Sequence, residues 1–225
     1  MLHRVGVEVV RYNPHARQQV FARKGIDVVF DVGANVGQYG QKLRAGGYRG
    51  RIVSFEPLPR PFEVLDRLAQ HDAAWNCLQL ALGETAQQTT MNVYGKESSS
   101  LLPLNNRMAQ ALGLKPGGLE TVTVCRLDDV VDDVAEPDSS IFLKLDVQGF
   151  ELQVLRGAEE HLSRVQGIEA ELSLAPVYDG QALFGEVVDH LEKRDFRMIW
   201  LERILLDPQT RDLLQVDGLF IRISG

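Results

Sequence analysis

The chain is poor in cysteine, and what little it has does not point to a disulfide or metal framework. Two of its 225 residues are cysteines, Cys77 and Cys125, and both lie in apolar stretches without a CxxC or His-rich context. A disulfide scaffold and a structural zinc site are therefore not expected. We expect two buried, unreactive thiols instead, because free cysteine behaves as a small apolar residue.

Basic residues are also in deficit, with 24 Lys and Arg against 31 Asp and Glu and a formal net charge of −7. Binding to nucleic acid or to anionic membranes needs a basic face, so neither partner is expected. Membrane helices need about 18 uninterrupted apolar residues, and no window approaches that length. Arg4 and Glu8 interrupt the N-terminal run that a signal peptide would need. We expect a cytoplasmic protein.

Short apolar runs alternate with helical patterns along the chain. This alternation is typical of a doubly wound α/β fold, in which helices cover both faces of a parallel sheet. No internal repeat or linker interrupts it, so we expect a single domain, 1–225, with an N-terminal lead, 1–25. Strands are expected at 27–32, 51–55, 75–80, 141–146, 168–173, 196–201 and 219–223, and helices from residue 36 and at 61–70, 151–164 and 181–194.

One stretch, residues 86–135, breaks the alternation. It contains a polar strand pattern at 89–94, three serines at 98–100, a loop rich in Pro and Gly, and a second strand pattern at 121–126. We interpret it as an inserted strand pair joined by a long loop. Long loops within compact domains are usually functional or disordered, so this insertion is a candidate lid or acceptor region.

The strongest motif is FDVGANVGQYG at 30–40, where a strand ends, a glycine-bearing turn follows and a helix begins. Gly33 and Gly37 allow the backbone to pass close to a ligand. A nicotinamide pyrophosphate needs a middle glycine, but Asn35 stands there. Asp31 suits a cationic group better than a phosphate, which favours S-adenosylmethionine. A purely structural turn is the alternative.

Charged residues also end two other predicted strands. Glu56 follows Gly33 by 23 residues, a spacing that places a carboxylate near both hydroxyls of a bound ribose. Lys144 and Asp146 are two residues apart and therefore share a strand face. Two charges on an apolar strand are costly to bury unless they are paired or functional. The alternatives are a solvated Glu56 and a structural ion pair.

Seven sequence motifs occur in a characteristic order. They are DVGANVGQYG, GRIVSFEP, ALG (81–83), the serines 98–100, CRLDD (125–129), FLKLDVQGFELQVLRGA and ELS…VYDG (171–180). Together they resemble the FkbM-type methyltransferases over residues 11–223. The resemblance implies a Rossmann-like class I sheet of seven strands with an antiparallel last strand, S-adenosylmethionine as cofactor, and O-methylation of a sugar or secondary metabolite.

The resemblance also assigns residues to the cofactor. Eight residues are assigned to binding of the methionine, ribose and adenine of the cofactor: Asp31, Gly33, Ala34, Asn35, Gly37, Glu56, Leu82 and Gly83. Ser99 and Ser100 are assigned to a segment that closes over the cofactor or the acceptor. Among these, Asp31 would face the ammonium, Glu56 the ribose and Leu82 the adenine.

Methyl transfer to an alcohol needs alignment and a group that takes the hydroxyl proton, or a metal that stabilises the alkoxide. Asp146 is the first candidate for the base or a metal ligand, with Lys144 tuning it or binding the acceptor oxygen. Glu171 is the second candidate, and with Asp146 it could bind Mg²⁺. Glu151 is the third, although an acidic residue also suits a helix N-terminus. Some relatives carry Glu where this chain has Gln148.

Two other functions stay open at this stage. A similar sheet could serve an NAD-type oxidoreductase, but Asn35 in place of the middle glycine argues against it. It could also serve a non-catalytic S-adenosylmethionine-binding module, but the intact Asp31, Glu56 and Asp146 argue against that. None of the five histidines has a spacing that indicates a site. The sequence leaves open the identity of the hydroxylated acceptor and the oligomeric state, a homodimer included.

Overall fold

The computed structural model describes residues 16–95 and 98–223. Its centre is a seven-stranded sheet in the order β3-β2-β1-β7-β8-β10-β9. Its strands are β1 (Val28–Val32), β2 (Arg51–Phe55), β3 (Trp75–Leu78), β7 (Ile141–Leu145), β8 (Val165–Ser173), β9 (Phe196–Leu206) and β10 (Leu213–Arg222). The pairs among β3, β2, β1, β7 and β8 are parallel, and β10 runs antiparallel to both its neighbours. The predicted sheet is confirmed, including its antiparallel last strand.

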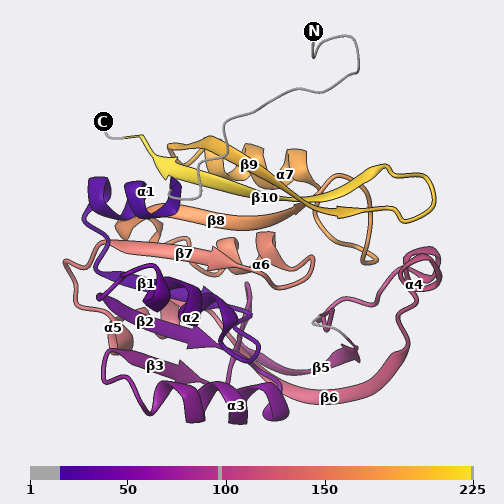
Figure 1. Cartoon of the computed structure of the whole chain (residues 1–225), viewed down its shortest axis with the longest axis horizontal. Coiled ribbons are helices and arrows are strands. Elements are labelled where there is room, and N and C mark those ends of the chain that lie inside the picture. Colours follow the sequence, from indigo (N-terminus) through magenta and orange to yellow (C-terminus); the bar gives the residue numbers. More distant parts are fainter. Residues whose placement is uncertain (1–15, 96–97, 224–225) are drawn as a thin grey trace, which may run out of the picture.

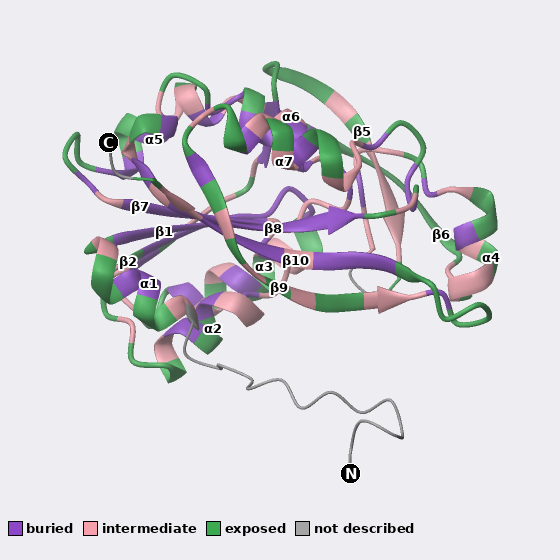
Figure 2. Cartoon of the chain, turned by 90° about the horizontal axis from the view of Figure 1, so that it is seen from above, coloured by how far each residue is buried: buried purple, intermediate pink, exposed green. Residues whose placement is uncertain are grey.

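Helices cover both faces of this sheet (Figures 1 and 2). One face carries α1 (Ala16–Lys24), α2 (Gln38–Ala45) and α3 (Pro59–Ala69), and the other carries α5 (Val131–Val134), α6 (Glu151–Arg156) and α7 (Phe184–Glu192). Because both faces are covered, every residue of β1 and β7 is buried. Within the described ranges, no helix combines the length and the apolar character needed to cross a bilayer.

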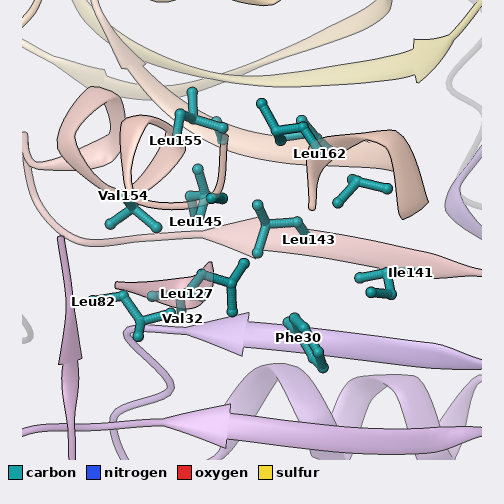
Figure 3. Close-up of a cluster of buried hydrophobic side chains, with 14 of the residues drawn as sticks. Phe30, Val32, Leu82, Leu127, Ile141, Leu143, Leu145, Val154, Leu155 and Leu162 are labelled. Carbon is teal, nitrogen blue, oxygen red and sulfur yellow. The ribbon is translucent and has the colours of Figure 1, made fainter. Parts of the chain in front are cut away.

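Each face of the sheet has its own apolar core, because successive side chains of a strand point to opposite faces. Phe30 and Leu143 pack toward Leu155 of α6 (Figure 3). Val29 and Phe142, one residue away on the same strands, pack on the α1–α3 side. Each such buried side chain stabilises the fold by roughly 1.5–3 kcal/mol.

The insertion, together with the short strand that precedes it, forms a second, three-stranded sheet beside the carboxyl end of the central one (Figure 1). It consists of β4 (Ala81–Leu82), β5 (Gln87–Tyr94) and β6 (Pro116–Cys125), with β5 and β6 antiparallel. The predicted strand pair is therefore confirmed. The connection between its strands holds a helix that the sequence did not reveal, α4 (Asn106–Leu112). The Asn105 side chain accepts from the Arg107 amide at its start, and Met108 packs with Tyr178 in a satellite core.

Several expectations about element limits are wrong. The helix expected at 151–164 ends at Arg156. Gly157, which follows it, packs so closely that an added Cβ would lie 1.9 Å from the carbonyl oxygen of Gly83. A short 3₁₀ turn, Leu162–Arg164, then leads into β8. The last two strands are longer than expected and form an extended hairpin (Figure 1).

The expected N-terminal lead falls partly outside the described residues, which begin at residue 16. Its described part is the helix α1, whose Val20 and Phe21 are buried in the core. Cys77 and Cys125 are free thiols, as expected, but both are half-buried rather than buried. Burial raises the pKa of Cys77 to about 11.

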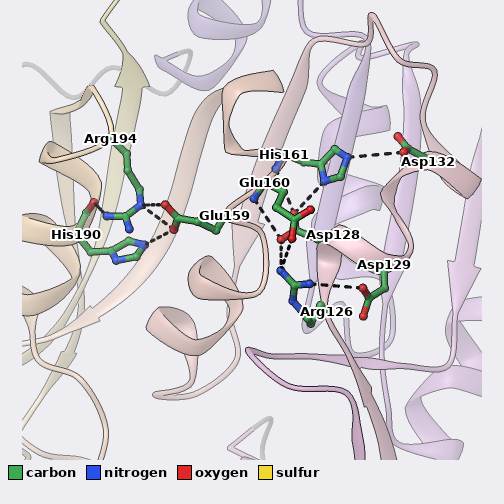
Figure 4. Close-up of polar contacts among 9 residues, drawn as sticks. All are labelled: Arg126, Asp128, Asp129, Asp132, Glu159, Glu160, His161, His190 and Arg194. Carbon is green, nitrogen blue, oxygen red and sulfur yellow. Dashed lines mark hydrogen bonds and ion pairs between the residues drawn. The ribbon is translucent and has the colours of Figure 1, made fainter.

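A polar cluster ties the segment after β6 to the connection between α6 and β8 (Figure 4). Asp128 accepts hydrogen bonds from Arg126 (2.7 Å) and from the backbone amides of Glu160 and His161. The His161 ring nitrogen Nδ1 lies 2.9 Å from the same carboxylate. None of these residues lines the cavity described below. The role of this cluster is therefore to hold the two connections together.

Gly157 provides a test of this packing. Gly157→Ala should lower the free energy of unfolding by about 1–3 kcal/mol, because its methyl group meets backbone that cannot move aside. Gly185→Ala is the matched control, since Gly185 lies in α7 with nothing within 4 Å of an added Cβ. That control should be neutral or stabilising by up to about 1 kcal/mol. Urea unfolding measures both, and equal effects would contradict the packing argument.

Candidate active site

A cavity of about 1020 Å³ opens at the carboxyl edge of the central sheet. Its walls come from the turns after β1, β2 and β7, from the insertion, and from α1 and α2. Small-molecule sites span roughly 300–1,000 Å³. The cavity therefore lies at the upper end of the range for small-molecule sites.

The structure brings most of the predicted site residues to this cavity. Those that line it are Asp31, Gly33, Ala34, Asn35, Glu56, Leu82, Ser99, Lys144 and Asp146. Those that do not are Gly37, Gly83, Ser100, Glu151 and Glu171. These five residues do not face the cavity, and their contacts are with other residues of the protein.

The turn after β1 is packed directly on the turn after β7. The backbone amides of Gly33 and Ala34 both donate to the carbonyl of Phe55 at 3.0 Å. Gly33 has φ +80°, and an added Cβ would lie 1.9 Å from the carbonyl oxygen of Asp146. Glycine is therefore required here by close backbone approach. This contact holds the first and third sequence motifs together at one edge.

Glu56 ties the β1 turn to the β2 turn. Its Oε2 accepts from the Asn35 amide (2.9 Å) and its Oε1 accepts from the Leu58 amide (2.8 Å). Burial raises the pKa of Glu56 to about 7. A carboxylate oxygen has two lone pairs, so each oxygen can still accept a hydrogen bond from a ligand in the cavity.

Asp31 is fully buried at the base of the cavity. Its Oδ2 accepts from the Ser54 hydroxyl (3.4 Å), which itself accepts from the Trp75 ring nitrogen (3.0 Å). Within the described part of the chain, its Oδ1 has no hydrogen-bond partner. Burial raises the pKa of Asp31 to about 6. A buried oxygen without a partner is costly, and a donor from a ligand would satisfy it.

Charged side chains cross the sheet beside Asp31. Asp31, Lys144 and Glu169 are register neighbours on β1, β7 and β8, so they share one face. Lys144 Nζ donates to Asp146 Oδ2 (2.8 Å) and lies 5.4 Å from the ring centroid of Tyr39. Burial acts to lower the pKa of Lys144, but the surrounding carboxylates outweigh it and raise that pKa above its usual value. The ammonium is therefore permanently charged.

The carboxylates of Asp146 and Glu171 are bridged by one amide. Gln148 Nε2 donates to Asp146 Oδ1 (2.8 Å) and to Glu171 Oε2 (3.0 Å), while its Oε1 accepts from the Tyr178 hydroxyl (2.7 Å). Burial acts to raise the pKa of Asp146, but Lys144 holds it below its usual range. Burial and the charge of Asp146 raise the pKa of Glu171 well above its usual value.

The Mg²⁺ site expected at Asp146 and Glu171 does not fit this arrangement. An amide nitrogen stands between the two carboxylates, and an ammonium engages the other oxygen of Asp146. Hard divalent cations need several oxygen ligands, and nitrogen donors fill those positions here. In residues 16–95 and 98–223, no group of three or more His, Cys, Asp or Glu side chains is placed to hold a metal ion.

Ser100 and Glu151 hold the turn after β7 from outside the cavity. The Ser100 hydroxyl donates to the carbonyl of Gln148 (2.7 Å), a residue with φ +56°. Glu151 Oε1 accepts from the backbone amides of Val147 and Gly149, both at 3.2 Å. Their contacts make them supports of the turn that carries Asp146, rather than groups that face a ligand.

Sequence reasoning missed Asp217, an acidic residue of β10 that lines the cavity. Burial raises the pKa of Asp217 to about 7. A signal was present in the sequence, because Asp217 is the one charge within the apolar run LLQVDGLFI. The reasoning that singled out Lys144, a charge on an otherwise apolar strand, applies equally to Asp217 and to Glu169.

Comparisons with known proteins agree with this geometry. The sequence model of the family described as "Methyltransferase FkbM domain" matches residues 31–198. "Methyltransferase sdnD" of Sordaria araneosa is 29% identical over 170 residues, 64% of this chain and 65% of that protein, so the chain spans just under two thirds of its length. "31-O-demethyl-FK506 methyltransferase FkbM" of Streptomyces tacrolimicus is 30% identical over 209 residues, 82% of this chain and 78% of that protein.

Solved structures share the fold at low sequence identity. A chain of a fibrillarin/Nop5p complex has a TM-score of 0.51 and 15% sequence identity, and the match covers 88% of this chain and 74% of that chain. An rRNA methylase from Streptococcus thermophilus matches 96% of this chain and 100% of its own with 9% identity and a TM-score of 0.50. At these identities the likeness concerns the fold alone.

The acidic groups of the site predict how stability depends on pH. Asp31, Glu56, Glu151 and Asp217 have pKa values of about 6 to 7 in the folded protein and about 4 when unfolded. The folded state therefore binds more protons in this window, and the free energy of unfolding should fall as pH rises from about 5 to about 8. Burial lowers the pKa of His190, so this one group acts in the opposite direction and makes the free energy of unfolding rise with pH.

Urea unfolding across that pH range measures the slope. Glu151→Gln should make it shallower, because burial holds the pKa of Glu151 at about 7 and its amide analogue does not titrate. Glu192→Gln, on the exposed side of α7, is the control that should leave the slope unchanged. A stability that rises with pH over this range would contradict the burial of these carboxyl groups.

Proposed function

Because the chain belongs to the FkbM family of S-adenosylmethionine-dependent methyltransferases, we propose that it transfers a methyl group from S-adenosylmethionine to a hydroxyl of a small molecule, a sugar or a secondary metabolite. The observation that carries this proposal is the cavity at the sheet edge, where an unpartnered oxygen of Asp31 and the Glu56 carboxylate face one space. The whole chain acts as one methyltransferase domain, with the insertion as the acceptor wall.

The residues of the cavity fit the cofactor. Asp31 Oδ1 lacks a partner within the described residues and would accept from the methionine ammonium. Glu56 would accept from the ribose hydroxyls, and Leu82 would pack on the adenine. The backbone of Gly33, Ala34 and Asn35 forms the turn against which the methionine lies. When bound, the cofactor supplies an electrophilic methyl group on a sulfonium.

The charge of the cavity favours a neutral acceptor. Its acidic lining residues are Asp31, Glu56, Glu120, Asp146, Glu169 and Asp217, and its basic ones are Arg17, Lys42, Arg60 and Lys144. The lining has a formal excess of two acidic residues, which disfavours a polyphosphate relative to a neutral polyol. One relative is named for a reaction on 31-O-demethyl-FK506, which supports an acceptor hydroxyl on a natural product.

Lys144 and Asp146, which line the cavity, are the pair that we assign to the acceptor hydroxyl. In-line transfer to a strong electrophile depends mainly on alignment of the two reactants. Asp146 would accept from the acceptor hydroxyl and orient it, since Lys144 and Gln148 fix its carboxylate in position. The permanent charge of Lys144 would stabilise negative charge that develops on the acceptor oxygen. Ser99 lies on the insertion side of the same space.

Glu56→Ala should weaken binding of S-adenosylmethionine and S-adenosylhomocysteine by about 1–3 kcal/mol, because ribose hydroxyls would lose their acceptor. Isothermal titration calorimetry measures both ligands. Glu63→Ala, an exposed residue of α3 that pairs with Arg67, is the matched control and should leave both affinities unchanged. A wild-type protein that binds neither ligand would refute the cofactor assignment.

Wild-type protein with S-adenosylmethionine should methylate hydroxyls within a panel of methyl glycosides, alkyl glycosides, deoxysugars and hydroxylated macrolides. Nucleotide sugars, which carry a diphosphate, should react slowly or not at all. Mass spectrometry detects the added methyl group and its position. Binding of the cofactor without methylation of any panel member would leave a non-catalytic binding module and contradict the proposed reaction.

A further inference from the structure

Asp217 differs from the other acidic groups that line or adjoin the cavity. It lies in the middle of β10, directly opposite Glu171 of β8 in the register of the antiparallel pair, and it lines the cavity. Among the described residues, no side chain or backbone group donates a hydrogen bond to its carboxylate, and it forms no ion pair within 4.0 Å. Both of its oxygens are therefore open to a ligand.

The neighbouring carboxylates are already engaged. Asp146 accepts from Lys144 and Gln148, and the ammonium stabilises its ionised form, which makes it a weak proton acceptor. Glu171 lies behind the Gln148 amide, outside the cavity lining. Glu151 is held by two backbone amides of the turn after β7. Two acids that line the cavity, Asp217 and Glu120, have no partner for their carboxylates among the described residues. Glu120 is exposed on β6, whereas Asp217 is half-buried beside Glu171 and combines shelter with access to the cavity.

We propose that Asp217 is the general base of the methyl transfer, the group that takes the proton of the acceptor hydroxyl, while Asp146 and Lys144 orient the acceptor oxygen. This inference rests on the proposed transfer to a hydroxyl. The acceptor oxygen forms a bond to the methyl carbon as the carbon–sulfur bond breaks, with its electron pair staying on sulfur. The O–H proton moves to Asp217 and is released to water after the product leaves.

The surroundings of Asp217 suit this role. Burial and the nearby carboxylates raise the pKa of Asp217 to about 7, and a general base works best when its pKa lies near the working pH. The charged groups that surround it on the neighbouring strands and α1 are Glu169, Asp146, Lys144, Arg17, Glu171 and Glu202. A cationic cofactor beside it would lower this pKa, so the rate should rise with pH up to about 7.

The test compares Asp217→Asn with wild type, using the panel acceptor that wild type methylates fastest. We expect kcat to fall about 100-fold, with the acid limb of the pH profile lost, and Asp217→Glu to recover part of the rate. Affinity for S-adenosylhomocysteine, measured by calorimetry, should stay within about threefold, since Asp217 is not assigned to the cofactor. Carboxyl ¹³C NMR should show Asp217 titrating near pH 7 in the free protein.

Controls separate this role from a general effect of charge. Glu202→Gln removes an acid directly opposite Asp217 on β9 and outside the cavity lining, and should leave kcat unchanged at about pH 8. Asp146→Asn should lower the rate but retain the acid limb. A near wild-type kcat for Asp217→Asn would overturn this inference but not the proposed function. A parallel loss of the variant's affinity for S-adenosylhomocysteine would do the same. A wild type that methylates no panel hydroxyl would overturn the proposed function and this inference together.

Discussion

One buried ammonium, that of Lys144, holds the acidic groups of the site together. An isolated buried charge is prohibitively costly, so the Lys144 side chain needs carboxylates around it, and the parallel register places Asp31 and Glu169 on the neighbouring strands. Asp146, two residues along, completes the pairing at 2.8 Å. The same charges that compensate one another at the sheet edge also give it the polarity that would suit a cationic cofactor and, in the proposed reaction, an acceptor hydroxyl.

Close backbone packing converts these charges into a site. Gly33 brings the β1 turn against the carbonyl of Asp146, and Glu56 joins that turn to the one after β2. The insertion then supplies the opposite wall and fixes the β7 turn through the hydrogen bond from Ser100 to Gln148. Residues outside the cavity thus determine where its lining residues lie, as expected when a precise site needs a rigid support.

The acidic groups that crowd this edge are a liability in the free protein and an advantage in the complex. Burial raises the pKa of Asp31 and Glu56, which means that their ionised forms destabilise the fold near neutral pH. A bound cation would relieve this repulsion and satisfy the unpartnered oxygen of Asp31. Asp217, which Lys144 does not engage directly, keeps a pKa of about 7 and is left able to accept a proton.

The sequence by itself determined the central sheet and the charged strand ends. Buried strands are apolar runs, so the charge of Lys144 within one of them is visible without coordinates. Tertiary structure alone decided the rest. The helix α6 ends at Arg156, Gly157 packs against the carbonyl of Gly83, and Ser100 supports a turn 48 residues away. Asp217 reaches the cavity through antiparallel pairing of β10 with β8. Periodicity records which residues are buried, whereas the partner that each buried polar group meets depends on contacts between distant segments.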